Sequence, residues 1–299
     1  MQRRVFIRNT AILTSASLLF QKQVLAQLFR TSEFNIKMLS KTTGIFTERG
    51  GTIGFVLSDE GIVVIDSQFP DTAKHFIEEA KKMKDKPFAY LLNTHHHGDH
   101  TGGNIAFKGA VSHVVAHQNA AAHLKTVAEK QNALDKQLLP DMTFTDELKI
   151  KVGKEKIKGY YFGAAHTNGD AVYHIEESDI VHVGDLMFNR RHPFIDRTAG
   201  ASIASWTKVL DSIVKEFSKK TTYIFGHAGT GYEVTGTAAD LIAFKGYLQS
   251  LLDFTAKEIA AGKTKEEILK ATEIPGGPEW KGDGIQRPLT AAYEELTLK

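Results

Sequence analysis

The segment NTHHHGDHTGG at residues 93–103 constrains this chain more than any other feature, because it holds four potential metal ligands within six residues. In extended backbone, residues two apart point the same way, so His95 and His97 are able to bind one ion. A glycine then lets the chain turn, after which Asp99 and His100 are able to reach a second ion. Imidazole and carboxylate ligands suit zinc, iron or manganese. The segment therefore predicts half of a two-metal site.

Three later segments repeat the arrangement of a short apolar strand followed by a ligand. The strands are expected near residues 158–163, 179–183 and 222–225, and the ligands that follow them are His166, Asp185 and His227. Open α/β sheets place their sites at the carboxyl ends of strands. We therefore expect these three side chains to converge on the histidine-rich segment.

This ordered set resembles the metallo-β-lactamase superfamily of metal-dependent hydrolases, over about residues 40–255. The motifs that carry the resemblance are an early Asp after a strand, His-x-His-x-Asp-His, and then a His, an Asp and a His. The resemblance implies one metal held by His95, His97 and His166, a second held by Asp99, His100 and His227, and Asp185 as the bridge between them. Asp66 would orient the ligand loop by hydrogen bonding. Strands and helices that repeat in two halves favour an α/β fold, the four-layer αββα sandwich of that family.

Differences between the ligand motifs of this chain and those of particular branches of the family narrow the range of expected substrates. Several β-lactamase branches use a cysteine ligand for the second metal, and this chain contains no cysteine. Other β-lactamases share His-x-His-x-Asp-His but lack the bridging Asp. Asp185 resembles instead the pattern of the thioester-cleaving glyoxalase II, of lactonases and of related hydrolases. The resemblance implies cleavage of an acyl bond in a small molecule, such as a thioester, lactone, ester or β-lactam amide.

The expected cofactor is a pair of divalent metal ions, with zinc expected first and iron or manganese as alternatives. A hydroxide that bridges two such ions has its pKa lowered to about 7, so it is a nucleophile at neutral pH. Metal-bound water, with Asp99 as the catalytic carboxylate, would supply a proton to the leaving group. Phosphodiester or phosphonate hydrolysis, a di-iron redox protein and a non-catalytic metal-binding protein are the alternatives.

The loop at residues 189–196 follows the bridging Asp and is expected to overhang the metals. Its Arg190, Arg191 and His192 are candidates for substrate binding, because a guanidinium holds a carboxylate through two hydrogen bonds. Alternatively, one of the arginines pairs with Asp196 and braces the loop. The other loops expected to shape the pocket lie near residues 43–53 and 130–145.

The N-terminus has the features of a twin-arginine signal peptide. Arg3 and Arg4 precede an apolar run at residues 11–20, and Val24-Leu-Ala26 resembles a cleavage site. An apolar run of about ten residues is too short for a bilayer core, which needs about 20. We expect a signal peptide at residues 1–26, export to the periplasm or beyond, and a single hydrolase domain at residues 27–299 without stable membrane insertion.

Charge and composition exclude several other classes of protein. Residues 1–26 hold four basic side chains and no acidic one, so the net charge of +2 becomes −2 once they are removed. This removes the electrostatic argument for a nucleic-acid partner. The hydrophobic fraction of 42% is ample for one buried core. The expected partner is a small-molecule substrate, and the oligomeric state stays open.

The remaining sequence predicts ordinary elements around the site. Strands are expected at residues 43–47, 52–57 and 61–65, followed by a helix that Asp71 caps. Ser202 or Ser205 caps a second helix, a long helix covers residues 238–261, and a final one covers 288–298 as a packed tail. Six further histidines are expected in surface or hydrogen-bonded core positions: His75, His113, His117, His123, His174 and His182.

Overall fold

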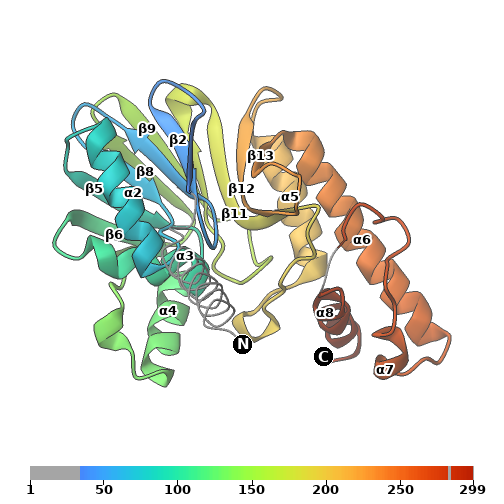
Figure 1. The fold of residues 1–299 in the computed structure, drawn as a ribbon. Coiled ribbons are helices and arrows are strands. Elements are labelled where there is room, and N and C mark those ends of the chain that lie inside the picture. The colour runs from blue at the N-terminus through green and yellow to red at the C-terminus, as the bar shows by residue number, and fades with distance from the viewer. Residues whose placement is uncertain (1–33, 282–283, 299) are drawn as a thin grey trace, which may run out of the picture. The chain divides into compact units, whose positions relative to one another are not determined.

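The computed structural model describes residues 34–281 and 284–298, and its two β-sheets lie between layers of helices (Figure 1). The first sheet holds seven strands in chain order. Strands β2 to β4 pair antiparallel, and β4 to β7 pair in parallel. Their bounds are β1 Asn35–Met38, β2 Thr43–Thr47, β3 Ile53–Leu57, β4 Ile62–Ile65, β5 Phe88–Asn93, β6 Val111–His117 and β7 Met142–Phe144. The three strands expected before residue 66 are confirmed to within one residue.

The second sheet has the strand order β13-β12-β11-β10-β9-β8. All its neighbours pair antiparallel except β11 and β12, which run in parallel. The bounds are β8 Glu147–Val152, β9 Glu155–Tyr160, β10 Val172–Ile175, β11 Ile180–Asn189, β12 Thr222–Ala228 and β13 Thr235–Gly236.

The second sheet differs from expectation in where its strands end. Asp185 and His227 lie inside β11 and β12, and His166 lies in the loop between β9 and β10. The pairing of β11 with β12 shifts register on both sides of Gly184, which has a φ of +52°. A bulge of this kind re-aims the side chains of a strand that continues past it. The prediction that these strands stop before their ligands was therefore wrong for β11 and β12.

Seven helices are labelled in the described part of the chain, with 3-10 turns between them. Their bounds are α2 Pro70–Met83, α3 Gly98–Thr101, α4 Gln118–Lys130, α5 Ile203–Glu216, α6 Ala238–Ala260, α7 Lys265–Ile268 and α8 Gln286–Thr297. The Ser202 hydroxyl accepts from the Ser205 amide and caps α5, as expected. Asp71 does not cap α2, because the cap position is Phe69; Asp71 pairs instead with Arg49 at 2.6 Å.

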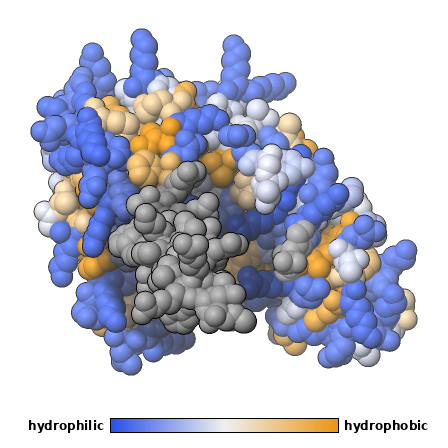
Figure 2. Space-filling model, viewed as in Figure 1, coloured by the Kyte–Doolittle hydropathy of each residue, from blue (hydrophilic) through white to orange (hydrophobic). Residues whose placement is uncertain are grey.

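Three buried apolar clusters define the layers of the unit at residues 36–299. One lies between α2 and the first sheet, with Phe76 and Phe107 at its centre. The second fills the space between the two sheets, and the third joins the second sheet to α5, α6 and α8 around Trp206. The αββα sandwich is therefore confirmed. Figure 2 shows a mostly hydrophilic face with small, separate hydrophobic areas, as expected when the apolar side chains fill these cores.

The expected signal peptide at residues 1–26 lies outside the described residues, so its presence stays a prediction. Within residues 34–281 and 284–298, no helix combines the length and the apolar character needed to cross a membrane.

Candidate metal centre

The ligand segment at residues 95–100 follows the end of β5 and runs into the very short helix α3. His95 is buried immediately after the strand, and His97 occupies the extended position that begins α3. Asp99 and His100 lie on the first turn of α3. His95 and His97 thus come before the helical turn, whereas Asp99 and His100 belong to it. The local fold therefore divides the motif between two clusters.

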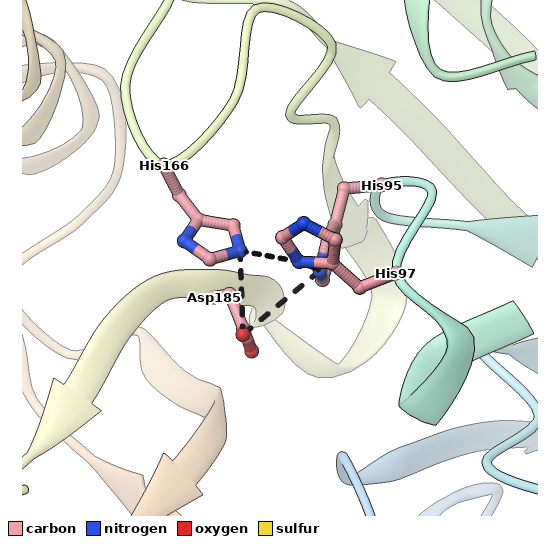
Figure 3. A group of neighbouring side chains, drawn as sticks. All are labelled: His95, His97, His166 and Asp185. Atoms are coloured by element: carbon pink, nitrogen blue, oxygen red, sulfur yellow. Dashed lines mark hydrogen bonds and ion pairs between the residues drawn. The ribbon is translucent and has the colours of Figure 1, made fainter. Parts of the chain in front are cut away.

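The first cluster brings together His95, His97 and His166, with Asp185 beside them (Figure 3). Nδ1 of His97 lies 3.0 Å from Nε2 of His95 and 2.9 Å from Nε2 of His166. The Oδ2 atom of Asp185 lies 3.9 Å from Nε2 of His95 and 3.5 Å from Nε2 of His166. Three ring nitrogens thus point at one place, as tetrahedral coordination of one ion requires.

The second cluster consists of Asp99, His100 and His227. Nε2 of His227 lies 3.1 Å from Oδ2 of Asp99 and 3.4 Å from Nε2 of His100. The other oxygen of Asp185, Oδ1, lies 3.0 Å from Nε2 of His100 and 3.5 Å from Nε2 of His227. Asp185 therefore presents one oxygen to each cluster.

Burial and charge control the protonation of the two clusters in opposite ways. In the first cluster, burial lowers the pKa of His95 well below its usual range and that of His166 to about 3. In the second cluster burial acts in the same direction, but the carboxylates of Asp185 and Asp66 outweigh it and raise the pKa of His100 well above its usual range. Burial also opposes ionisation of Asp185, yet the charges of His227 and His100 lower its pKa strongly.

These features fit metal ions. Neutral imidazoles with their lone pairs directed at one point are the form of histidine that ligates a metal. Oδ1 of Asp185 is buried and makes no hydrogen bond to any of the described residues, so an acceptor at the centre of the site is left without a donor. The carboxylates of Asp66, Asp99 and Asp185 lie around His100, and a bound cation would balance their negative charge. The seven side chains would hold two divalent ions, with Asp185 between them.

Three acceptors orient the metal-facing rings from behind. Oδ2 of Asp66 accepts from Nδ1 of His100 at 2.7 Å and from the Thr94 hydroxyl at 2.7 Å. The Phe194 carbonyl accepts from Nδ1 of His166 at 2.8 Å. Such partners fix the tautomer of a ligating histidine and raise its basicity. The geometry of Asp66 is that of the orienting residue expected from the family resemblance.

The third acceptor, Asp196, has a role that the sequence did not indicate. Its Oδ2 accepts from Nε2 of His97 at 3.0 Å, and its Oδ1 accepts from the Thr198 and Ala199 amides. Although burial opposes it, the hydrogen bond from His97 lowers the pKa of Asp196. The ion pair between Asp196 and Arg190 or Arg191, which was the alternative to substrate binding, is not formed within the described residues. No spacing signal could have revealed this contact, since 99 positions separate the two side chains.

His96 and the six other histidines lie outside the two clusters. The His96 ring is buried against His123, and its Nε2 lies 3.7 Å from Oδ2 of Asp196. The six occupy the surface or hydrogen-bonded positions that were expected; for example, Nε2 of His182 donates to the Thr52 carbonyl. Other partners include Asn168 for His123, Asp141 for His113 and Asp179 for His174.

A cavity of about 290 Å³ opens onto the second cluster. It is lined by His97, Asp99, Asp185, Phe188, Arg191, His192, Pro193, Phe194, His227, Gly284 and Arg287. The loop near residues 187–200 lines it as expected, but those near 43–53 and 130–145 do not. The sequence also did not indicate the contribution of Gly284 and Arg287, because the C-terminal segment was expected to be only a packed tail.

The three candidate substrate-binding residues of the loop have different surroundings. Arg191 and His192 line the cavity, and Nδ1 of His192 lies 2.9 Å from the Tyr247 hydroxyl. Arg190 does not line it. Its side chain packs over the Trp280 ring and is held by Glu279 and Asp240. Arg190 therefore braces the loop, with partners other than the one the sequence suggested.

Comparison with known proteins places this geometry in a family. The model of the metallo-β-lactamase superfamily matches residues 46–227, which is more than half of the chain. The chain belongs to this superfamily, and the family, fold and ligand set identify a metal-dependent hydrolase.

Individual relatives are distant. The chain is 25% identical over 210 residues to a type 2 metallo-β-lactamase of Bacillus cereus, covering 67% of this chain and 79% of the relative. It is 25% identical over 174 residues to one of Elizabethkingia meningoseptica, covering 58% and 67%. A solved metallo-β-lactamase from Pontibacter korlensis superposes with a TM-score of 0.60 at 21% identity, covering 73% of this chain and 99% of that one. The solved structure supports the fold alone.

Proposed function

We propose that this protein is an exported dinuclear metallohydrolase that cleaves an acyl bond of a small molecule. The observation that carries the proposal is the position of Asp185, whose two oxygens face the two ligand clusters separately. A carboxylate so placed supports a pair of ions close enough to act on one substrate. A scaffold or storage role would not require a cavity that opens onto the same ligands.

The metal ions, when bound, supply a hydroxide at neutral pH and polarise the acyl carbonyl. The side chains determine where these effects act. His95 and His166 are buried, whereas His97, Asp99 and His227 line the cavity, so the site is open on the cavity side. The substrate is therefore proposed to enter from the cavity and present its acyl carbon between the two clusters.

Asp99 is the group best placed to move a proton. Its side chain is one-third exposed and lines the cavity, while Oδ2 contacts Nε2 of His227. Although burial opposes ionisation, the contact with His227 lowers the pKa of Asp99 in the metal-free protein, so its carboxylate is charged at neutral pH. We propose that the Asp99 carboxylate relays a proton from water at the site to the leaving group as the acyl bond breaks.

The test combines metal analysis with a substrate panel. The purified protein is analysed for metals and assayed with a chromogenic cephalosporin, a glutathione thioester, a lactone and a phosphodiester. We expect about two zinc ions per chain and turnover of one acyl substrate. Turnover of the phosphodiester alone would replace the acyl assignment with phosphoesterase activity. Less than one metal per chain, even after zinc or iron is added, would refute the dinuclear site.

Variants of the bridging residue sharpen this test. Asp185→Asn keeps the shape of the side chain but removes the charge shared by both clusters, so both metals and nearly all turnover should be lost. Asp179→Asn is the matched control, because Asp179 is a partly exposed carboxylate that bonds Ser218 and Thr221 away from the site. Unchanged activity in Asp185→Asn would contradict the proposed site.

Export is proposed from the sequence of residues 1–26, with cleavage after Ala26. Twin-arginine export carries folded proteins, which suits a site assembled from five separate segments of the chain. Replacing Arg3 and Arg4 with lysine should retain the uncleaved protein in the cytoplasm. N-terminal sequencing of the periplasmic fraction measures the cleavage site.

A further inference from the structure

Four arginines lie around the loop after β11 and the start of α8, and they fall into two pairs. Arg190 and Arg197 are neutralised by carboxylates: Arg190 by Glu279 at 3.2 Å, and Arg197 by Glu295 at 3.0 Å. The other two, Arg191 and Arg287, line the metal cavity. Neither forms an ion pair with a carboxylate of residues 34–281 or 284–298. Of these four arginines, Arg191 and Arg287 are the two that have no carboxylate partner within the described part of the chain.

Within the described residues the Arg191 side chain makes one polar contact, and this contact does not compete with a ligand. Its Nη1 atom lies 3.5 Å from Nδ1 of His227. Nε2 of His227 faces the second cluster, so a His227 that ligates through Nε2 carries its proton on Nδ1. A protonated Nδ1 cannot accept a hydrogen bond from the guanidinium. Among residues 34–281 and 284–298, no other acceptor thus competes with a ligand for the donors of Arg191.

Arg287 belongs to the C-terminal segment, which lies beyond the residues matched by the superfamily. It sits on the first turn of α8, and that helix is held firmly because Leu289 and Ala292 are fully buried. Glu295, on the same helix, accepts from the Ile203 and Ala204 amides at the start of α5. The guanidinium is therefore presented to the cavity from a rigid support.

A second groove of about 370 Å³ continues from the cavity along α8. Phe194 and Arg287 line both spaces. Beyond them the groove is lined by Ile195, Asp196, Arg197, Thr198, Gln286, Thr290, Ala291 and Glu294. It offers room for the part of a substrate that does not react. Phe194 and Arg287 therefore lie where the cavity and the groove meet.

The charges of the cavity favour an anionic molecule. Two divalent ions would bring more positive charge than the carboxylates of Asp99 and Asp185 neutralise. Arg191 and Arg287 add to this excess, and among the described residues Asp99 and Asp185 are the acidic side chains of the cavity lining. A concave site with one sign of charge raises the local concentration of oppositely charged ligands.

We propose that Arg191 and Arg287 together bind a carboxylate of the substrate, with the scissile acyl group over the metal ligands. The inference rests on the proposed acyl hydrolysis and narrows its substrates to carboxylate-bearing acyl compounds. A guanidinium matches a carboxylate through two parallel hydrogen bonds, whereas an ammonium acts as a point charge. Arg287 is thus a specificity-determining residue that lies outside residues 46–227, the part of the chain that the superfamily model matches.

The test uses two thioesters of phenylacetic acid that differ only in charge. One leaving group is 3-mercaptopropanoate, and the other is its neutral amide, 3-mercaptopropanamide. We expect Arg287→Leu to lower kcat/KM for the charged thioester about tenfold or more and to leave the neutral one nearly unchanged. Arg287→Lys should give an intermediate loss. Lys270→Leu, which removes an exposed positive charge from the same segment outside the cavity, is the control.

A binding measurement separates this inference from the proposed reaction. The metal-loaded protein is heated with 4-phenylbutanoate or its amide, and the rise in Tm is recorded. Wild type should be stabilised more by the carboxylate than by the amide, and Arg287→Leu should lose that difference. An unchanged difference, or an equal loss for both thioesters, overturns the role of Arg287. If wild type cleaves neither thioester, the proposed reaction fails for this class, and the Tm comparison still decides the role of Arg287.

Discussion

The Asp196 carboxylate and the His97 imidazole form a hydrogen bond of 3.0 Å between Oδ2 and Nε2, on the side of the ring opposite the metal ligands. Nδ1 of the same ring faces His95 and His166. The contact therefore fixes the tautomer in which Nδ1 carries the lone pair. Asp66 does the same for His100 in the second cluster, where Nδ1 donates and Nε2 faces the site. Each cluster thus has its own orienting carboxylate.

Asp196→Asn should weaken the first metal site selectively. The amide oxygen is still able to accept from the Thr198 and Ala199 amides, so the local turn is retained. The amide nitrogen, however, cannot accept from Nε2 of His97. We expect the affinity for one metal to fall about 10- to 100-fold. Competition with a chromogenic chelator measures it, and an unchanged affinity would show that the contact does not orient His97.

Asp66→Asn should weaken the second metal site instead. The new amide nitrogen would face Nδ1–H of His100, and relief of this clash places the proton on Nε2, where it blocks ligation. Asparagine tolerates the φ of +63° at this position, so the backbone should be retained. We expect a similar loss of affinity, but for the other ion. Cobalt substitution distinguishes the sites, because their donor sets give different absorption spectra; loss of the same ion in both variants would contradict two separate roles.

The sequence located the candidate ligands because their spacing is a local feature. Histidine and aspartate spacing, with the strands before them, identified the seven side chains that the structure gathers into two clusters. The contacts that orient these side chains were harder to predict from the sequence. The position of Asp66 was expected from the family pattern. Asp196 reaches His97, and Arg287 reaches the cavity, only because distant segments of the chain pack together, and such packing leaves no periodic signal in the sequence.

The errors in the fold prediction have a similar origin. Hydrophobic periodicity located α2 and α5, but the position of a cap depends on backbone geometry that a lone Asp71 does not determine. The continuation of β11 past Asp185 depends on the bulge at Gly184. From the sequence, we expected this strand to end near residue 183, before Gly184 and Asp185. The pocket walls depend on how α8 packs against α5, which no local pattern contains.

His182 should make the metal-free protein less stable in mild acid. Its ring is fully buried, with Nε2 donating to the Thr52 carbonyl and Nδ1 accepting from the Gly184 amide. Burial lowers the pKa of His182 in the folded state. The unfolded chain therefore binds more protons below about pH 6.5, so stability is full above that pH and falls as the pH decreases.

The size of this effect follows from proton linkage. While the folded ring stays neutral, each pH unit below about 6.5 costs about 1.4 kcal/mol. Urea unfolding of the chelator-treated protein at pH 7.5 and 5.5 measures the loss in wild type and in His182→Gln. The variant is less stable at both pH values but should lose less between them. An equal loss in both proteins would assign the effect to other histidines.

Gly226→Ala should abolish metal binding, whereas a matched glycine replacement should not. A Cβ atom at Gly226 would overlap Oδ1 of Asp185 and crowd the backbone of Gly184, so the bridging carboxylate would have to move. Gly246, inside α6, has open space where its Cβ would lie, and alanine there should stabilise the helix by about 0.5–1 kcal/mol. Metal analysis and thermal unfolding of both variants test the difference. If Gly226→Ala keeps two metals and full turnover, then the space beside Asp185 is not needed for the bridge.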